Sequence, residues 1–197
     1  MTGIPAPQGE QPARGSRRTL WLIIALVVAP VAASYIAYYA WRPAHSTNYG
    51  ELLPPRPLPE ARLALTDGKP FSLSQLKGKW VLAMVDSGAC DARCEMKLTY
   101  LRQLRLTQGK DVERIERVWL VSDGVAPRPD LAAAYAGTWL VRADGALLER
   151  FPATGAPAEH IYVIDPLGNL MLRYPRDPEP RRMIRDLTRL LKASQIG

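Results

Sequence analysis

Residues 80–101 read WVLAMVDSGACDARCEMKLTYL, and this stretch decides the fold. Its first six residues, 80–85, form a short apolar run, which predicts a buried strand. Cys90 and Cys94 follow, and from Cys90 to about Gln108 apolar side chains recur at helical spacing, as at Leu98 and Leu101. The stretch therefore predicts a core strand that leads through a loop into a helix, with two cysteines at the start of that helix.

The segments on either side of this unit alternate between strand-like and helix-like patterns. Segments 61–66 and 70–76 flank an Asp67-Gly68 turn, and a Pro166-Leu167-Gly168 turn separates two further strands. Strands are expected at residues 117–121, 139–141, 161–164 and 170–174, and helices at residues 130–135 and along the apolar face formed by Met183, Ile184, Leu187, Leu190 and Leu191. This order predicts an α/β domain with helices covering a mixed sheet.

An uncharged apolar segment precedes this domain. Residues 20–41 read LWLIIALVVAPVAASYIAYYAW, and about 20 such residues cross the hydrocarbon core of a bilayer. Pro30 is compatible with this interpretation, because membrane helices accept proline more readily than soluble helices do. We therefore expect one transmembrane helix at residues 19–41, with the lipid bilayer as a partner.

The residues that flank this segment predict its orientation. Arg17 and Arg18 precede it, which favours a cytoplasmic N-terminus, and aromatic residues up to Trp41 suit the far interface. The domain would then lie outside the cytoplasm. The alternative is a cleaved signal peptide, since Ala32, Ala33 and Ser34 are small enough for a peptidase site.

Composition divides the remaining chain into three parts. Residues 1–18 are rich in Pro, Gly and Gln, which predicts a disordered cytoplasmic tail. Residues 42–59 hold five prolines, which predicts a semi-extended spacer that lifts the domain off the membrane. Residues 60–197 form the predicted domain, which is long enough to bury a core without disulfides.

Charge and motifs exclude several classes of function. The formal net charge is +7, and many of the basic residues lie in the last helix, where they could face an anionic membrane surface, an acidic partner or simply solvent. No nucleic-acid motif and no interleaving of basic with aromatic residues is present, so we expect no nucleic-acid partner. No constellation typical of hydrolases or nucleotide enzymes is found either.

Cys90 and Cys94 are the only cysteines of the chain. Positions i and i+4 share one face of a helix, so both sulfurs can approach one metal ion or each other. The partial positive charge of a helix N-terminus stabilises the thiolate, which is both the nucleophile and the metal-binding form. The pair therefore predicts either Cu(I) binding or thiol–disulfide exchange. A purely structural disulfide is the alternative, although so short a loop contributes little stability.

Imidazole suits copper as an additional ligand, and the chain has two histidines. His45 lies in the proline-rich segment, where a solvated linker residue is expected. His160 comes just before the strand at residues 161–164, where it is either a surface residue or a third ligand beside Cys90 and Cys94.

At this point the sequence resembles the Sco/SenC family of membrane-anchored, thioredoxin-like proteins. The matching segments are DGKPFSL at residues 67–73, LKGKWVL at residues 76–82, the C-x-x-x-C pair, and IYVIDPLG at residues 161–168. The resemblance implies a thioredoxin-like fold and a bacterial inner membrane location with the domain in the periplasm. It also implies copper as a cofactor and a role in assembling the copper centre of cytochrome oxidase, with an oxidase subunit or another extracytoplasmic client as partner.

The chain departs from the pattern of that family at two places. Asp91 and Glu95 follow the two cysteines, where the family usually has prolines. The family's histidine corresponds in position to Pro157, so that His160 is displaced by three residues. An odd shift along a strand turns a side chain to the opposite face of the sheet.

Three functions are consistent with these observations. In the first, Cys90, Cys94 and His160 bind Cu(I) and pass it to an oxidase subunit. In the second, the cysteine pair reduces cysteines in a client, with Cys90 as the attacking thiolate, and His160 is dispensable. In the third, the fold is a docking scaffold and neither cysteine is needed. The sequence leaves open whether the protein is an enzyme.

Overall fold

The structure, a computed structural model, describes residues 17–40 and 48–194 and divides the chain into two units, Met1–His45 and Ser46–Gly197. Most of the predicted tail, together with Trp41 and His45, lies outside the described residues. Arg17 and Arg18, assigned to that tail above, are the first two residues of a helix.

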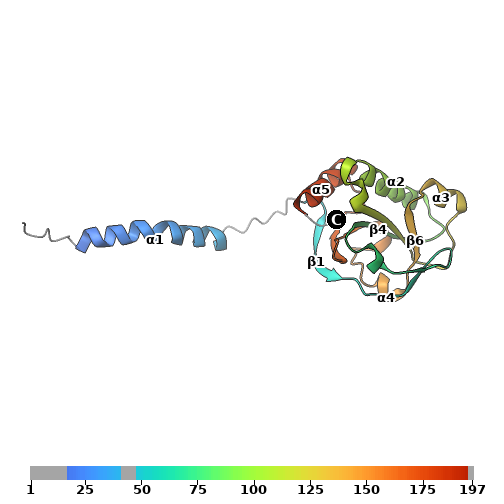
Figure 1. The fold of residues 1–197 in the computed structure, drawn as a ribbon, viewed down its shortest axis with the longest axis horizontal. Coiled ribbons are helices and arrows are strands. Elements are labelled where there is room, and N and C mark those ends of the chain that lie inside the picture. The colour runs from blue at the N-terminus through green and yellow to red at the C-terminus, as the bar shows by residue number, and fades with distance from the viewer. Residues whose placement is uncertain (1–16, 41–47, 195–197) are drawn as a thin grey trace, which may run out of the picture. The chain divides into compact units, whose positions relative to one another are not determined.

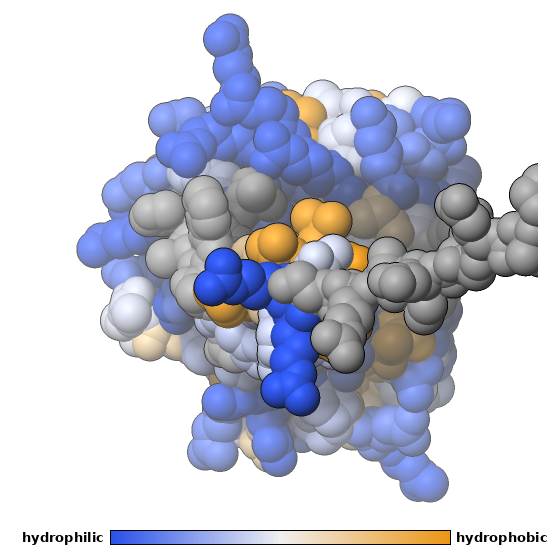
Figure 2. All heavy atoms as spheres, turned by 90° about the vertical axis from the view of Figure 1, so that its left-hand side faces the viewer, coloured by the Kyte–Doolittle hydropathy of each residue, from blue (hydrophilic) through white to orange (hydrophobic). Residues whose placement is uncertain are grey.

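This helix, α1 (Arg17–Ala40), contains nearly all of the predicted membrane segment, and Pro30 lies inside it. It is long and apolar enough to cross a membrane, and none of its apolar window is buried against protein. By length and composition this helix is a candidate single-pass anchor. The globular unit has the opposite character, since hydrophilic residues dominate the part of its surface that is visible in Figure 2.

The globular unit contains one eight-stranded sheet (Figure 1). Its strands are β1 (Glu51–Pro57), β2 (Leu63–Leu65), β3 (Pro70–Phe71), β4 (Trp80–Asp86), β5 (Ile115–Val121), β6 (Thr138–Arg142), β7 (Ile161–Ile164) and β8 (Asn169–Arg173). Its helices are α2 (Ala92–Leu106), α3 (Pro129–Ala134), α4 (Gly145–Leu148) and α5 (Pro180–Ala193), with short 3-10 helices η1 (Leu73–Leu76), η2 (Gly109–Arg114) and η3 (Pro157–Glu159).

The sheet is mixed, as the sequence predicted. Its strand order is β1-β8-β7-β4-β5-β6-β2-β3. Strands β4, β5 and β6 are parallel, and β4 pairs antiparallel with β7, which continues antiparallel to β8 and β1. Strand β4 thus lies in the middle of the sheet, and the loop that leaves its carboxyl end carries Cys90 and leads into α2, which carries Cys94.

Two apolar clusters lie on opposite faces of the sheet. One face is covered by α2, α3 and α5, and the other by α4 and η1, which Figure 1 shows on opposite sides of β4. Strand β7 divides its side chains between them, because successive residues of a strand point to opposite faces. Ile161 and Val163 pack in the cluster that contains both cysteines, whereas Tyr162 and Ile164 pack in the other.

The prediction of a proline-rich spacer at residues 42–59 is wrong for residues 51–57. Residues 51–57 form β1, which pairs antiparallel with β8 at the edge of the sheet, for example Glu51 with Arg173. Proline cannot donate a ladder hydrogen bond, so it is tolerated at a sheet edge, and here the register shifts between Leu52 and Arg56, around Pro54 and Pro55. The domain therefore begins before residue 60.

The predicted helix at residues 90–108 starts too early. Asp91 is the N-cap and α2 runs from Ala92 to Leu106, so Cys90 lies in the loop before the helix. Aspartate favours the N-cap position because its carboxylate accepts a hydrogen bond from a backbone N–H of the first turn. Cys94 is on the first turn of α2, which places the two cysteines on either side of the cap.

Candidate dithiol site

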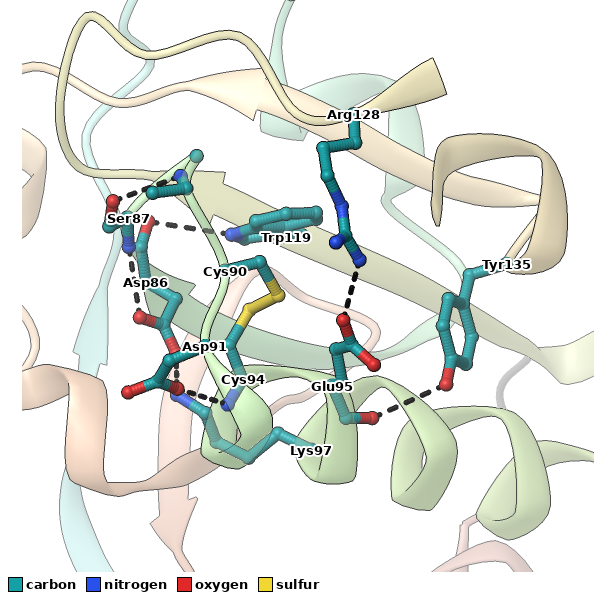
Figure 3. The surroundings of a disulfide bond; sticks show 12 residues. Asp86, Ser87, Cys90, Asp91, Cys94, Glu95, Lys97, Trp119, Arg128 and Tyr135 are labelled. Carbon is teal, nitrogen blue, oxygen red and sulfur yellow. Dashed lines mark hydrogen bonds and ion pairs between the residues drawn. A yellow bond between two sulfur atoms is a disulfide. The ribbon is translucent and has the colours of Figure 1, made fainter. Parts of the chain in front are cut away.

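Cys90 and Cys94 form a disulfide with a Cα–Cα distance of 5.1 Å (Figure 3). Both belong to the apolar cluster under α2, and their exposed fractions are 5% and 0%. Both cysteines are therefore buried, and Cys90 is the slightly more exposed residue of the two. The approach of the two sulfurs at the start of the helix is as predicted.

The backbone around Cys90 is arranged to bring the two sulfurs together. Cys90 has a φ of +43°, the left-handed region, and it is the only non-glycine residue with a positive φ among the described residues. A residue held in this region costs about 1–3 kcal/mol, and such residues cluster at functional sites. The Asp91 carboxylate accepts a hydrogen bond from the Cys94 N–H at 2.9 Å, so the cap itself places Cys94 at the positive end of α2.

The loop that joins β4 to the disulfide is held by local hydrogen bonds. The Ser87 N–H donates to the Asp86 carboxylate at 2.9 Å, and the Ala89 N–H donates to the Ser87 hydroxyl at 3.0 Å. The Gly88 N–H donates to Asp123 Oδ1 at 3.0 Å, which ties the loop to the segment after β5. A hydrogen bond from the Ser87 side chain and the one from Gly88 lower the pKa of Asp123.

An ion pair lies beneath the disulfide. Lys97, one turn after Cys94 on α2, places its Nζ 2.7 Å from Asp86 Oδ2, and the side chains are only 4% and 15% exposed. The same ammonium donates to the carbonyl oxygens of Val85, at 3.1 Å, and of Ala158. Burial lowers the pKa of Lys97, and the hydrogen bond and charge of Asp86 oppose that shift.

Lys97 was not among the residues predicted to form the site, although the sequence contains one signal for it. Lys97 lies three residues after Cys94 and next to Leu98, on the face of α2 that turns to the core. A lysine on an apolar helix face needs a partner, because burying an unpaired charge is costly. Asp86, at the end of the core strand, is that partner.

The predicted third ligand is not assembled with the cysteines. Among residues 17–40 and 48–194, no group of three or more His, Cys, Asp or Glu side chains is arranged to hold a metal ion. His160 is 3% exposed, and its Nδ1 lies 2.8 Å from the carbonyl oxygen of Tyr174, so Nδ1 carries the proton and donates. Its ring lies against Tyr162, at 6.1 Å between centroids.

His160 lies away from the cysteines because side chains alternate between the two faces of the sheet along β7. His160 has an extended backbone and lies two residues before Tyr162, so its side chain points to the same face as those of Tyr162 and Ile164. These two residues pack in the cluster that does not contain the cysteines. Because Pro157–Glu159 form η3 and not a strand, the displacement of three residues noted in the sequence is not itself a shift along β7. The other histidine, His45, is outside the described residues.

The arrangement supports reversible two-electron chemistry. A disulfide at a helix start can be opened to a dithiol whose thiolate is stabilised by the helix dipole. Fold and site together define a thioredoxin-like protein with a single dithiol–disulfide pair. The chain belongs to the family described as transmembrane-like, thioredoxin-like, C-terminal domain, whose model matches residues 80–194.

Solved structures with the same fold support this assignment. Copper-bound ScoI of Bradyrhizobium japonicum is 18% identical over 68% of this chain and 99% of its own, with a TM-score of 0.51. BsSco, described as a Sco-family cytochrome c oxidase assembly protein with a disulfide switch, is 16% identical over 76% of this chain and 98% of its own, with a TM-score of 0.52.

A putative protein disulfide isomerase of Bacteroides thetaiotaomicron is 18% identical over 75% of this chain and 92% of its own, with a TM-score of 0.52. These likenesses confirm the resemblance to Sco/SenC proteins as one of fold. A comparison with curated protein sequences gives no significant match.

Proposed function

We propose that this protein is a membrane-anchored thiol–disulfide exchange protein that acts through Cys90 and Cys94. The observation that carries the proposal is the disulfide itself, closed across the N-cap of α2 by a cysteine held at a positive φ. A simple staple between residues four apart would stabilise the fold little, because the loop it closes is short.

In the proposed reaction the reduced protein gives two electrons to a client disulfide. The Cys90 thiolate attacks one client sulfur, a mixed disulfide forms, and the other client sulfur leaves as a thiolate that takes up a proton. The Cys94 thiolate then attacks Cys90, which releases the client as a dithiol and restores the Cys90–Cys94 disulfide. A dithiol reductant on the same side of the membrane must reduce the protein again.

Lys97 and Asp86 have a defined part in this scheme. The Asp86 carboxylate pairs with the Lys97 ammonium at 2.7 Å and keeps that ammonium in place. Because Lys97 also donates to the carbonyl oxygen of Val85 on β4, the pair fixes the position of α2 relative to the central strand.

The location follows from α1. Arg17 and Arg18 lie at its start, and Tyr35, Tyr38 and Tyr39 lie near its end, which supports a cytoplasmic N-terminus and a periplasmic domain at a bacterial inner membrane. An extracytoplasmic compartment also permits a disulfide to persist. Protease added to spheroplasts should digest the globular unit; full protection of that unit would contradict this orientation.

The exchange function is tested with the detergent-solubilised full chain and insulin as the substrate, with dithiothreitol as the reductant. We expect catalysed insulin reduction by the wild type and by His160→Asn, and none by Cys90→Ser. Cys94→Ser should retain the client as a mixed disulfide on Cys90. Wild-type rates no faster than those of dithiothreitol alone would overturn the proposal.

A second candidate function is Cu(I) delivery to a cytochrome oxidase subunit. The reduced pair offers two soft thiolates at the start of one helix, which is donor chemistry that Cu(I) prefers, and the fold is shared with copper-bound ScoI and with BsSco. Cys90 and Cys94 would bind the ion, and their thiolates would neutralise its positive charge. The position of His160 is unsuited to a third ligand, so a copper site here would rest on the cysteines.

Cu(I) titration of the reduced full chain against a competing chelator tests this second function. One-to-one binding that Cys90→Ala abolishes and His160→Ala leaves intact would support delivery through a two-cysteine site. Binding lost equally in His160→Ala would show that reduction reorganises the site, and an absence of competitive binding would remove copper from the proposed functions.

A further inference from the structure

Helix α5 exposes a stripe of positive charge. Five basic side chains of this helix are exposed, namely Arg181, Arg182, Arg185, Arg189 and Lys192. At 3.6 residues per turn they fall within an arc of about 100°. The acidic residue of α5, Asp186, is buried next to the stripe, where it binds backbone N–H groups and not solvent. Met183, Leu187 and Leu191 fix the orientation of the helix by packing on the core.

The chain that arrives from α1 is fastened to this same helix. The backbone N–H groups of Tyr49 and Gly50 donate to the two carboxylate oxygens of Asp186, at 2.9 and 2.7 Å. The Tyr49 hydroxyl accepts a hydrogen bond from the Glu179 N–H at 2.9 Å, and the Arg182 guanidinium lies 4.2 Å from the Tyr49 ring. The point where the globular unit is attached to its anchor is therefore on α5.

Chain length limits how far α5 can be from the membrane. Ala40 ends α1 and Asn48 begins the described part of the globular unit, which is eight peptide steps. Eight steps span at most about 29 Å when fully extended. A compact unit of about 150 residues has a radius of gyration near 15 Å, or a diameter near 38 Å. Asn48, beside the residues fastened to α5, is thus held within about 29 Å of Ala40, a distance shorter than the diameter of the unit.

From these two facts we propose that the basic stripe of α5 docks on anionic lipid headgroups of the membrane in which α1 is anchored. The proposal rests on α1 as a membrane anchor and is independent of the chemistry of the cysteine pair. Lipid phosphates are the occupant favoured here, because the tether keeps the stripe near the headgroups whether or not a partner protein is present. Docking would hold the globular unit in one orientation relative to the membrane surface.

The strength of docking should depend on charge number and on salt. Each basic residue near an anionic surface changes the ratio of docked to undocked protein by about five-fold. Removing three of the charges should lower that ratio roughly 100-fold. Added salt should have a similar effect, because the Debye length falls from about 10 Å at 0.1 M to about 3 Å at 1 M.

The test uses the full chain in nanodiscs of phosphatidylcholine alone or mixed with phosphatidylglycerol. Incorporation is first shown by co-migration with the disc, so that a failure of the anchor is distinguished from a failure of docking. Ala193→Cys, exposed at the end of α5, is labelled with a fluorescent donor, and the lipids carry a headgroup acceptor. Ala146→Cys, exposed on α4 across the sheet, is the matched control. Both native cysteines are in the disulfide and do not take the label.

We expect energy transfer from position 193 to rise in the anionic discs, to fall with added salt, and to fall in the triple variant Arg181→Gln, Arg185→Gln and Lys192→Gln. A second triple variant removes the same net charge elsewhere, at the exposed Arg56, Arg62 and Arg150, and should leave the transfer unchanged. Equal transfer in neutral and anionic discs would overturn the proposal and leave an acidic protein as the partner of the stripe. An equal loss in both triple variants would overturn it as well.

Discussion

Lys97 Nζ lies 2.7 Å from Asp86 Oδ2 in the core beside the Cys90–Cys94 disulfide, and both side chains are largely shielded from water. The pair joins α2, which carries Cys94, to the end of β4, where the loop with Cys90 begins. A buried pair of this kind contributes little compared with an apolar pair of the same volume, but the loss of one partner leaves a buried charge without compensation. The pair therefore makes the geometry of the site sensitive to either residue.

Replacement of Lys97 by methionine should lower the free energy of unfolding by about 3–5 kcal/mol, because the carboxylate of Asp86 is then left without its partner. Urea unfolding of the oxidised protein measures this change. The double variant Lys97→Met/Asp86→Asn is the control, and it should recover most of the loss. A double variant as unstable as the single one would show that Lys97 acts by packing rather than by pairing.

Gly88 is the glycine at which an added side chain would disturb the disulfide loop. A Cβ at this position would lie 1.8 Å from the Val125 carbonyl oxygen, a backbone atom. Gly88→Ala should displace the segment around Val125, lower stability by at least about 2 kcal/mol, and speed reduction of the disulfide by dithiothreitol. Gly124→Ala, in the same segment and with no atom within 4 Å of its Cβ, is the matched control. Similar reduction rates in the two variants would contradict the assigned contact.

Stability should fall above about pH 10, where tyrosine ionises in the unfolded chain. Burial raises the pKa of Tyr162 and of Tyr174 in the folded state. A raised folded pKa means that the contribution to stability is complete below the unfolded value and is lost as the pH rises toward the folded one. Each tyrosine should therefore remove about 1.4 kcal/mol per pH unit above pH 10.

Urea unfolding measured between pH 8 and pH 11 tests this dependence. Tyr174→Phe should reduce the loss of unfolding free energy per pH unit by the contribution of one tyrosine. The lowered pKa of Lys97 acts in the opposite direction, but equally in both proteins, so their difference isolates Tyr174. The same slope in both proteins would show that Tyr174 ionises in the folded state as readily as in the unfolded chain.

Asp186→Ala should release the start of the globular unit from α5. The N–H groups of Tyr49 and Gly50 would lose a charged acceptor, and hydrogen bonds to charged groups contribute about 1.5–3 kcal/mol each. Amide hydrogen exchange at Tyr49 and Gly50 should accelerate well before exchange in β4 changes. Thr188→Ala is the comparison. Thr188 is on the same helix as Asp186, and its replacement removes a hydrogen bond to the side chain of Gln108, which lies outside α5. Unchanged exchange at Tyr49 and Gly50 in Asp186→Ala would contradict the clamp.

Much of the fold could be predicted because its signals are local. The apolar run at β4, the helical spacing along α2 and the turn at Pro166–Gly168 each depend on residues within a few positions of one another. The boundaries were less accurate. The start of α2 was predicted too early because Asp91, and not a residue before Cys90, is the N-cap. Strand β1 was predicted to be a spacer because its pairing partner, β8, is more than a hundred residues away.

The sequence by itself determined that Cys90 and Cys94 meet at a helix start, since they are only four positions apart and this spacing alone limits the distance between them. Tertiary structure decided what surrounds them. The parity of β7 turns His160 to the opposite face of the sheet, and the packing of α2 on β4 buries Lys97 against Asp86. Both outcomes depend on which strand pairs with which and in what register, and that choice is made by contacts between residues far apart in the chain.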